Sequence, residues 1–282
     1  MGEYPQKLPI TVAIPVKNEE ANLEFCLERL GRFAEVVVID SGSTDRTVDI
    51  ASRFGARVLD FQWDGKYPKK RNWFLLQGLP KQSWVFFLDA DEFVDEAFCD
   101  EIEAAVNDDR YNGYWLNYTN YFLGKELKHG IPQRKLALFR FGKGLYERIE
   151  EKGWSELDME VHEHPVLEGE VGEIKQPIDH RDFQGIAKFI QTHKEYALWE
   201  ARRCWAVQNN TDAWKSFTSR QRFKYRYMGK WWYPWLYFLF TYVTYNEIVQ
   251  NYHKTLSICL VLYKYWEIFD LDTFVFVLNY AN

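Results

Sequence analysis

The sequence predicts an α/β protein with a mostly parallel sheet flanked by helices, followed by a C-terminal helical extension. Three observations support this class. Apolar runs of strand length alternate with helical patterns through the first 110 residues. Most of these apolar runs end in polar residues, at the sheet edge where open α/β folds bind their ligands. Beyond residue 183 the periodicity becomes helical, and the composition then turns basic and aromatic.

The elements of the first half follow from apolar runs and helix stop signals. Residues 10–16 (ITVAIPV) and 35–40 (EVVVID) are predicted strands because they are short apolar runs. Residues 18–31 carry apolar side chains at helical spacing and end at a glycine, which predicts a helix. The next expected elements are a helix capped by Thr44 and Asp45 and ending near Gly55, a strand at 56–61, a helix at 68–78 and a strand at 84–89.

The second half of the chain has less regular sequence patterns, so fewer elements are predicted there. Residues 113–124 and 135–141 have the composition of strands, and a loop is expected around residues 128–132 between them. Residues 142–177 are rich in Glu and Gly and show weak periodicity, so no element is predicted there. A helical pattern resumes at residues 183–207.

Composition excludes several classes of protein. Hydrophobic residues make up 47% of the chain and charged residues 27%, which indicates a folded globular body. The net charge of −6 gives no electrostatic footprint for nucleic acid. The four cysteines show no CxxC spacing, so neither a disulfide framework nor a zinc site is expected. We therefore expect a reduced, cytoplasmic protein.

A cluster of carboxylates follows the predicted strand at residues 84–89. Asp89 and Asp91 form an Asp-Ala-Asp sequence with Glu92 directly after it. Such carboxylates repel one another unless a cation lies between them, and Mg²⁺ or Mn²⁺ prefers oxygen ligands of this kind. Acidic pairs are also common in solvated turns. The polar ends of two other strands at the same edge favour the cation.

Four segments resemble the family 2 glycosyltransferases of GT-A fold: VAIPVKNEE, VVVIDSGSTDRT, KRN and FFLDADE, in this order. The resemblance implies transfer of a sugar from a nucleotide diphosphate donor, with inversion and usually with a divalent metal. NYFLGKELKHG, LALFR and VHEHPVLEGEVG are similar to the lipopolysaccharide-core glucosyltransferase branch. On this basis residues 1–182 are expected to form the catalytic domain, with a nucleotide-sugar half at about 1–110 and an acceptor half at about 111–182. Residues 183–282 are the helical, aromatic-rich extension.

The resemblance also assigns roles to single residues on the donor side. Pro15, Asn18 and Glu19 are expected to border the nucleotide, and Asp40 to face the base or ribose with Ser41 and Ser43 beside it. Arg71 resembles an arginine that approaches the diphosphate, although a helix-surface charge is the alternative. Asp89 is expected to contact the ribose or the metal, and Asp91 the metal.

An inverting transfer needs a general base that takes the proton of the acceptor hydroxyl. The resemblance places this base at Glu163, with His162 in support, and an exposed acidic loop is the alternative because several other glutamates lie nearby. His180 resembles a histidine that completes the metal shell. A histidine at this position could also be a helix cap or a surface group.

The C-terminal extension combines basic and aromatic residues. Residues 231–246 are uncharged and contain Pro234, and the stretch is shorter than the ~20 apolar residues of a transmembrane helix. Arg222, Lys224 and Arg226 precede it, which suits contact with an anionic membrane surface. A homodimer interface and a helical lid are the alternatives.

Together these observations predict a hexosyltransferase that uses a UDP-sugar and a glycan or lipid-linked acceptor at the inner face of the cytoplasmic membrane. A nucleotidyltransferase would need a glycine-rich basic loop after the first strand, which PVKNEEANL lacks. A non-catalytic nucleotide-sugar-binding or scaffold protein of the same fold is the remaining alternative.

Overall fold

The computed structural model describes most of the chain up to residue 208 and one further helix. The described residues are 7–122, 124–128, 133–148, 158, 164–208 and 219–227.

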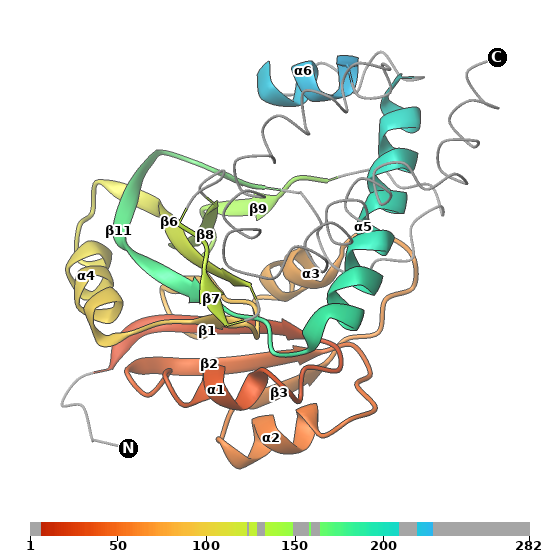
Figure 1. Ribbon diagram of the computed structural model, residues 1–282. Coiled ribbons are helices and arrows are strands. Elements are labelled where there is room, and N and C mark those ends of the chain that lie inside the picture. The colour runs from red at the N-terminus through yellow and green to blue at the C-terminus, as the bar shows by residue number, and fades with distance from the viewer. Residues whose placement is uncertain are drawn as a thin grey trace, which may run out of the picture. The chain divides into compact units, whose positions relative to one another are not determined.

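The first half of the chain alternates strands and helices, as the sequence predicts. Its elements are β1 (Leu8–Val16), α1 (Leu23–Leu27), β2 (Phe33–Asp40), α2 (Thr47–Arg53), β3 (Arg57–Asp60), α3 (Lys70–Leu76), β4 (Trp84–Phe87), β5 (Glu92–Phe93) and α4 (Glu96–Val106). The first four strands lie in the order β3-β2-β1-β4 and run parallel (Figure 1). Their carboxyl ends therefore meet at one edge, where the polar residues of β1, β2 and β4 come together.

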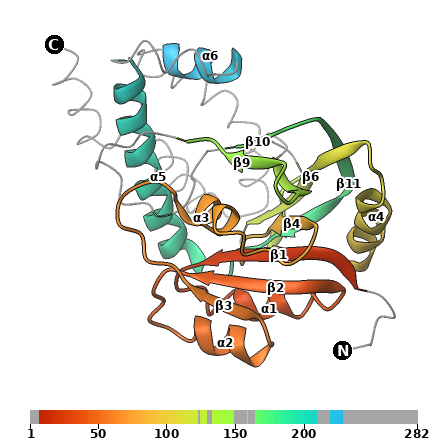
Figure 2. The same cartoon turned by 180° about the vertical axis from the view of Figure 1, so that it is seen from behind.

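The second half completes the sheet with strands of mixed direction. Its strands in this sheet are β6 (Tyr111–Phe122), β7 (Lys125–Glu126), β8 (Arg134–Arg140) and β11 (Glu170–His180). β9 (Gly144–Tyr146) and β10 (Pro165–Leu167) pair in a separate antiparallel sheet of two strands. β8 runs antiparallel to both β4 and β6, and the order continues β4-β8-β6-β11-β5. The expected α/β class is confirmed, with a parallel first part and a mixed remainder (Figure 2).

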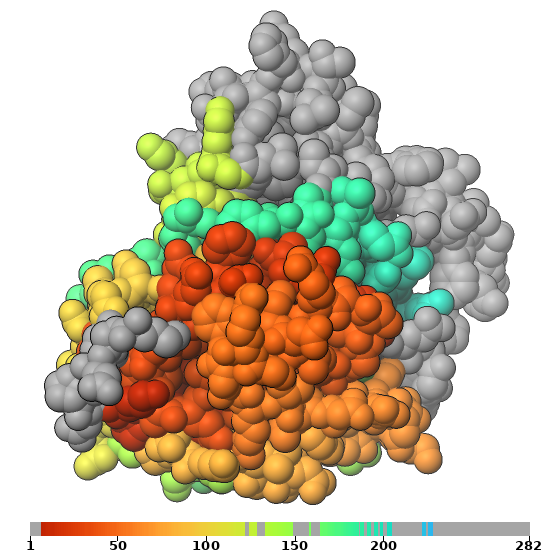
Figure 3. All heavy atoms as spheres, turned by 90° about the horizontal axis from the view of Figure 1, so that it is seen from below, coloured from red at the N-terminus to blue at the C-terminus, as the bar shows by residue number. Residues whose placement is uncertain are grey.

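The residues of β4 explain why helices cover both sides of the sheet. Trp84 and Phe86 point into one apolar cluster, which includes side chains of α1 and α4. Val85 and Phe87 point into a second cluster with Phe74 of α3. This alternation is the period of two that a strand imposes on its side chains. Seen from below, residues of the first third of the chain, in red and orange, form a continuous surface on the side of α1 and α2 (Figure 3).

β11 is the longest strand that the sequence did not predict. It has eleven residues and lies between β6 and β5, but only Ile174 and Ile178 are buried among them. Its pairing with β6 shifts register between these two isoleucines, which marks a bulge. The extra residues break the alternation of apolar and polar side chains, so the strand has no period-two signature.

α1 is shorter than the helix expected at residues 18–31. Asn18 has a positive φ of 57°, a left-handed conformation that cannot start a right-handed helix. The helix begins at Leu23 and ends at Leu27. Beyond it the backbone tightens, since the N–H of Leu30 donates to the carbonyl of Leu27.

The chain divides into two compact units. The first comprises Met1–Glu126 and Pro132–Gln184, and the second Leu127–Ile131 and Gly185–Asn282. In the second unit the expected helix at residues 183–207 is found as α5 (Gly185–Gln208), and α6 (Ser219–Tyr227) follows. The guanidinium of Arg203 lies 5.2 Å from the ring centre of Trp199 and 5.3 Å from that of Tyr225.

The membrane-binding hypothesis concerns mainly residues beyond these helices. Arg222 and Arg226 belong to α6, whereas residues 231–246 lie outside the described part of the chain. Among the described helices, none combines the length and the apolar character needed to cross a bilayer. The domain boundary at residue 182 and the membrane contact both stay predictions.

Replacing Asn72 by leucine should destabilise the first unit by about 2–5 kcal/mol. The Asn72 side chain is buried, donates to the carbonyl of Tyr146 at 3.0 Å and accepts from the Tyr146 N–H at 2.8 Å. Leucine fills a similar volume but leaves both backbone groups of Tyr146 without these bonds. Urea unfolding measures the loss. Gln77→Leu, an exposed position at the end of the same helix, is the control and should shift the midpoint little. Equal midpoints for Asn72→Leu and wild type would contradict the account.

Candidate functional site

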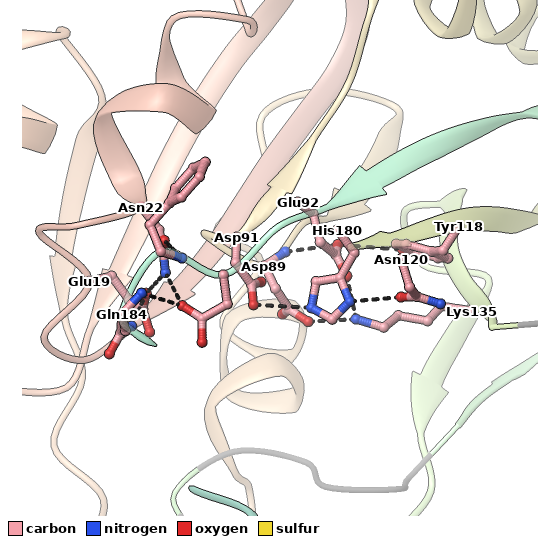
Figure 4. Close-up of polar contacts among 12 residues, drawn as sticks. Glu19, Asn22, Asp89, Asp91, Glu92, Tyr118, Asn120, Lys135, His180 and Gln184 are labelled. Carbon is pink, nitrogen blue, oxygen red and sulfur yellow. Dashed lines mark hydrogen bonds and ion pairs between the residues drawn. The ribbon is translucent and has the colours of Figure 1, made fainter. Parts of the chain in front are cut away.

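Polar side chains from three strand ends and from β11 gather at the carboxyl edge of the sheet. Figure 4 shows Glu19 after β1, Asp89 and Asp91 after β4, and His180 at the end of β11 within one cluster. These residues are up to 161 positions apart in the sequence, from Glu19 to His180. Parallel pairing explains the convergence of the first three, and the pairing of β11 with β6 and β5 brings in the fourth.

The loops after β1 and β2 are locked to each other around Asp40. The buried carboxylate of Asp40 accepts from the N–H of Gly42 at 3.1 Å and from that of Ser43 at 3.0 Å. The Ser43 hydroxyl accepts from the N–H of Asn18 at 2.8 Å, and the Asn18 side chain accepts from the N–H of Thr44 at 2.8 Å. The nucleotide-binding loops that the resemblance implies are therefore in contact and held rigidly by side-chain hydrogen bonds.

Two further expected residues lie in the same region. Pro15 is the last residue but one of β1 and pairs with Ile39 of β2. The Ser41 hydroxyl is buried and has no hydrogen-bond partner among the described residues. A buried polar group without a partner costs free energy, so this hydroxyl is available to a ligand or a water molecule.

Asp91 and His180 contact each other directly. The Nε2 atom of His180 lies 3.1 Å from a carboxylate oxygen of Asp91, and its Nδ1 lies 3.0 Å from the side-chain oxygen of Asn120. Burial alone would lower the pKa of His180, but the hydrogen bond and the charge of Asp91 outweigh it and raise that pKa. The N–H of Arg181 also donates to the carbonyl of Asp91, at 2.8 Å, which fixes β11 to the turn after β4.

Both side chains of this pair are of types that can ligate a divalent metal. Two ligands of one Mn²⁺ or Mg²⁺, each about 2.1 Å from the ion and at right angles, lie about 3 Å apart. The observed 3.1 Å fits such a pair as well as it fits a hydrogen bond. Within the described residues there is no group of three or more His, Cys, Asp or Glu side chains that could hold a metal ion. A metal here would need further ligands from a substrate.

Asp89 is held by two cations. Arg71 of α3 donates to one oxygen of Asp89 at 2.9 Å, and Lys135 of β8 donates to the other at 2.7 Å. Burial opposes ionisation of Asp89, but Lys135 and Arg71 outweigh it and lower its pKa below the ordinary range. The expected contact of Asp89 with the ribose or the metal stays a prediction.

Glu19 connects the loop after β1 to the segment after β11. Its carboxylate accepts from the side chain of Asn22 at 2.9 Å and from that of Gln184 at 2.6 Å. The buried Asn22 also accepts from the N–H of Phe183 at 2.8 Å. Burial raises the pKa of Glu19 to about 7, and the charge of Asp91 adds to this shift.

Lys70 is a buried ammonium below the site. It donates to the carbonyl of Val16 at the end of β1, at 3.2 Å, and lies 3.3 Å from the carboxylate of Asp158. Its backbone N–H donates to the carbonyl of Asp158 at 3.0 Å. Burial lowers the pKa of Lys70, and Asp158 opposes that shift. The lysine thus ties the region of residue 158 to the nucleotide-binding edge.

The expected base lies outside the described residues. Glu163 and His162 both belong to this part of the chain, and their roles stay predictions. The neighbouring His164 is described, and its carbonyl accepts from the N–H of Glu147 at 3.1 Å.

Sequence comparison identifies the family. Residues 11–159, just over half of the chain, match the profile of glycosyl transferase family 2. The chain belongs to glycosyl transferase family 2. The resemblance found in the sequence motifs is therefore confirmed, and the parallel β1–β4 sheet with its acidic edge agrees with the GT-A type expected for the family.

Individual relatives match over part of their length. The lipopolysaccharide core biosynthesis glycosyltransferase LpsC of Rhizobium meliloti is 34% identical over 174 residues, which is 59% of this chain and 60% of LpsC. An uncharacterized glycosyltransferase of Rickettsia bellii is 38% identical over 111 residues, 38% of this chain and 37% of the relative. The match thus covers less than two thirds of either relative. Residues 1–349 of Staphylococcus aureus TarS superpose with a TM-score of 0.37 and 19% identity over 47% of each chain, too weakly to support a functional conclusion.

Three charged residues at this site were not predicted as site residues from the sequence. Lys135 and Lys70 lie in segments predicted as a strand and a helix, and Glu92 was grouped with the repelling carboxylates. A usable signal existed for Lys135, because it directly precedes the apolar run LALF. A lysine that enters a buried strand needs a carboxylate partner, and the cluster of Asp89, Asp91 and Glu92 contained carboxylates that were expected to repel one another.

Proposed function

We propose that this chain is an inverting, metal-dependent glycosyltransferase that moves a hexose from a UDP-sugar to a glycan or lipid-linked acceptor of the cell envelope. The observation that carries the proposal is the Asp91–His180 contact at the carboxyl edge, beside the interlocked loops around Asp40. A nucleotide diphosphate would add oxygen ligands to a metal held by this pair, which supports metal-assisted donor binding.

Several of the expected site residues have roles in this proposal. Asp40 and the partnerless hydroxyl of Ser41 would receive the nucleoside, and Arg71 would contact the diphosphate. A bound Mg²⁺ or Mn²⁺ would neutralise charge on the diphosphate leaving group. Asp91 and His180 would hold that ion. The protein groups then need only orient the donor and exclude water from it.

The acceptor class is inferred from sequence similarity. LpsC is named as a lipopolysaccharide core biosynthesis glycosyltransferase, and its match covers 59% of this chain. We therefore propose a lipopolysaccharide-core type of acceptor, with Glu163 as the general base and His162 in support. Contact with an anionic membrane through the segment around residues 222–246 would bring the protein to such an acceptor, and a homodimer is the alternative use of that segment.

A donor panel tests the proposal. Purified protein is incubated with UDP-glucose, UDP-galactose, a GDP-sugar and a CMP-sugar, and release of nucleotide is measured with Mn²⁺ and with chelator. We expect slow hydrolysis of one UDP-hexose that stops in chelator. If no nucleotide sugar is hydrolysed and none binds, the proposed glycosyltransferase activity with a UDP-sugar is wrong. Binding of a UDP-sugar without turnover, even with lipopolysaccharide core as acceptor, would favour the non-catalytic alternative.

A further inference from the structure

A lysine from β8 lies between two carboxylates of the turn after β4. The ammonium of Lys135 is 2.7 Å from an oxygen of Asp89 and also contacts an oxygen of Glu92 (Figure 4). Its nitrogen lies 5.2 Å from the ring centre of Tyr118. Two carboxylates and an aromatic ring therefore fix the position of this cation.

Glu92 is buried and serves as the anchor of the lysine. Its second oxygen accepts from the backbone N–H of Asp89 at 3.1 Å and lies 3.4 Å from the hydroxyl of Tyr118. The N–H of Glu92 in turn donates to the carbonyl of Asp89 at 3.0 Å. Glu92 is thus bonded to the turn through both its backbone and its side chain, and it cannot reach a ligand.

Asp89 has the opposite character, because it is partly exposed and faces the site. Its side chain retains 29% of its accessible surface, against 1% for Glu92. Arg71 holds one oxygen and Lys135 the other. If Arg71 is drawn toward the diphosphate of a donor, Lys135 is the partner that continues to fix the carboxylate.

We propose that Lys135 is a positioning residue for donor binding: anchored by Glu92, it orients the Asp89 carboxylate toward the hydroxyl groups of the nucleotide sugar. This inference rests on the proposed function. It adds two residues, Lys135 and Glu92, that do not touch the donor but determine how well Asp89 binds it. The competing explanation is that the lysine only neutralises a buried glutamate.

Two variants separate positioning from neutralisation. Lys135→Met removes the cation and leaves Glu92 buried without it. The double variant Lys135→Met with Glu92→Gln removes both charges and restores a neutral pair of similar volume. Lys135→Arg keeps a cation that can bridge two carboxylates. Lys175→Met is the matched control, because Lys175 is an exposed lysine on β11.

The probe is UDP, titrated calorimetrically at saturating Mn²⁺, and the thermal midpoint of each variant is measured in parallel. We expect Lys135→Met to unfold at lower temperature and to bind UDP about 10–100-fold more weakly, as is usual when a residue supporting a ligand contact is lost. The double variant should recover most of the thermal midpoint but not the affinity. Lys135→Arg should recover most of both, and Lys175→Met should match wild type.

The outcomes are distinct. Wild-type affinity in the double variant, or in Lys135→Met, would overturn the positioning role and leave the proposed function intact. If wild-type protein itself fails to bind UDP, the UDP-sugar proposal fails, and the donor-binding role of Lys135 fails with it. If Lys135→Met does not fold, the double variant alone decides between positioning and neutralisation.

Discussion

Asp91→Asn should leave the fold unchanged and lower transfer by about 1,000-fold or more. The carboxylate of Asp91 faces His180 at 3.1 Å, and asparagine keeps the shape and a hydrogen bond but loses the charge that is proposed to hold a divalent cation. Metal stabilisation of developing charge is worth several kcal/mol, and each 1.4 kcal/mol is a factor of ten in rate. Turnover of the UDP-sugar is the measurement, with circular dichroism and the thermal midpoint as checks of the fold.

Asp49→Asn is the matched control for this substitution. Asp49 is exposed in the first turn of α2 and has no role in the proposed site, so its amide variant should keep wild-type turnover. Substantial transfer by Asp91→Asn would show that Asp91 does not hold the metal. Undiminished transfer by wild type in excess chelator would remove the metal from the mechanism altogether.

Glu163→Gln should reduce turnover by about 100-fold or more, the usual contribution of a general base. Glutamine keeps the size of the side chain but cannot accept the proton of the acceptor hydroxyl. Because this change concerns the acceptor, affinity for UDP and slow hydrolysis of the donor without acceptor should differ little from wild type. Steady-state turnover with acceptor, measured beside calorimetric titration of UDP, separates the two effects.

Asp158→Asn provides a contrast to Glu163→Gln. Asp158 is the counter-charge of the buried ammonium of Lys70, at 3.3 Å, so its loss should lower the thermal midpoint of the protein. Two results together would assign the role of base to Asp158. They are near-wild-type turnover in Glu163→Gln and a fall in the turnover of Asp158→Asn that is larger than its loss of folded protein.

The carboxyl edge of the sheet could be predicted from the sequence, because local apolar patterns identify the strands and the parallel order of the strands then places their ends together. The strands ending near Val16, Asp40 and Phe87 are apolar runs, and parallel order alone brings their ends to one edge. Asp91 followed from the spacing of its carboxylates. His180 came only from the family resemblance, since nothing local in the sequence places a residue 89 positions away beside Asp91.

The rest of the candidate site depends on pairing between distant strands, which leaves no local pattern in the sequence. β11 is interrupted by a bulge between Ile174 and Ile178, so its alternation is lost, although it is the strand that delivers His180. Lys135 and Glu92 are 43 positions apart and become partners only because β8 pairs with β4 beside the turn. The ammonium of Lys135 neutralises part of the acidic cluster after β4. From the sequence, only a bound metal was expected to do so.

Asp91 and His180 are proposed to hold one divalent cation together with the donor diphosphate. Electron paramagnetic resonance of Mn²⁺ tests it most directly, because the signal of free Mn²⁺ falls as the ion is bound. In wild-type protein with UDP we expect uptake of one Mn²⁺ per chain, weakened at least tenfold by omission of UDP, by Asp91→Asn or by His180→Ala. Uptake of equal affinity in wild type and both variants, or uptake indifferent to UDP, would contradict the account.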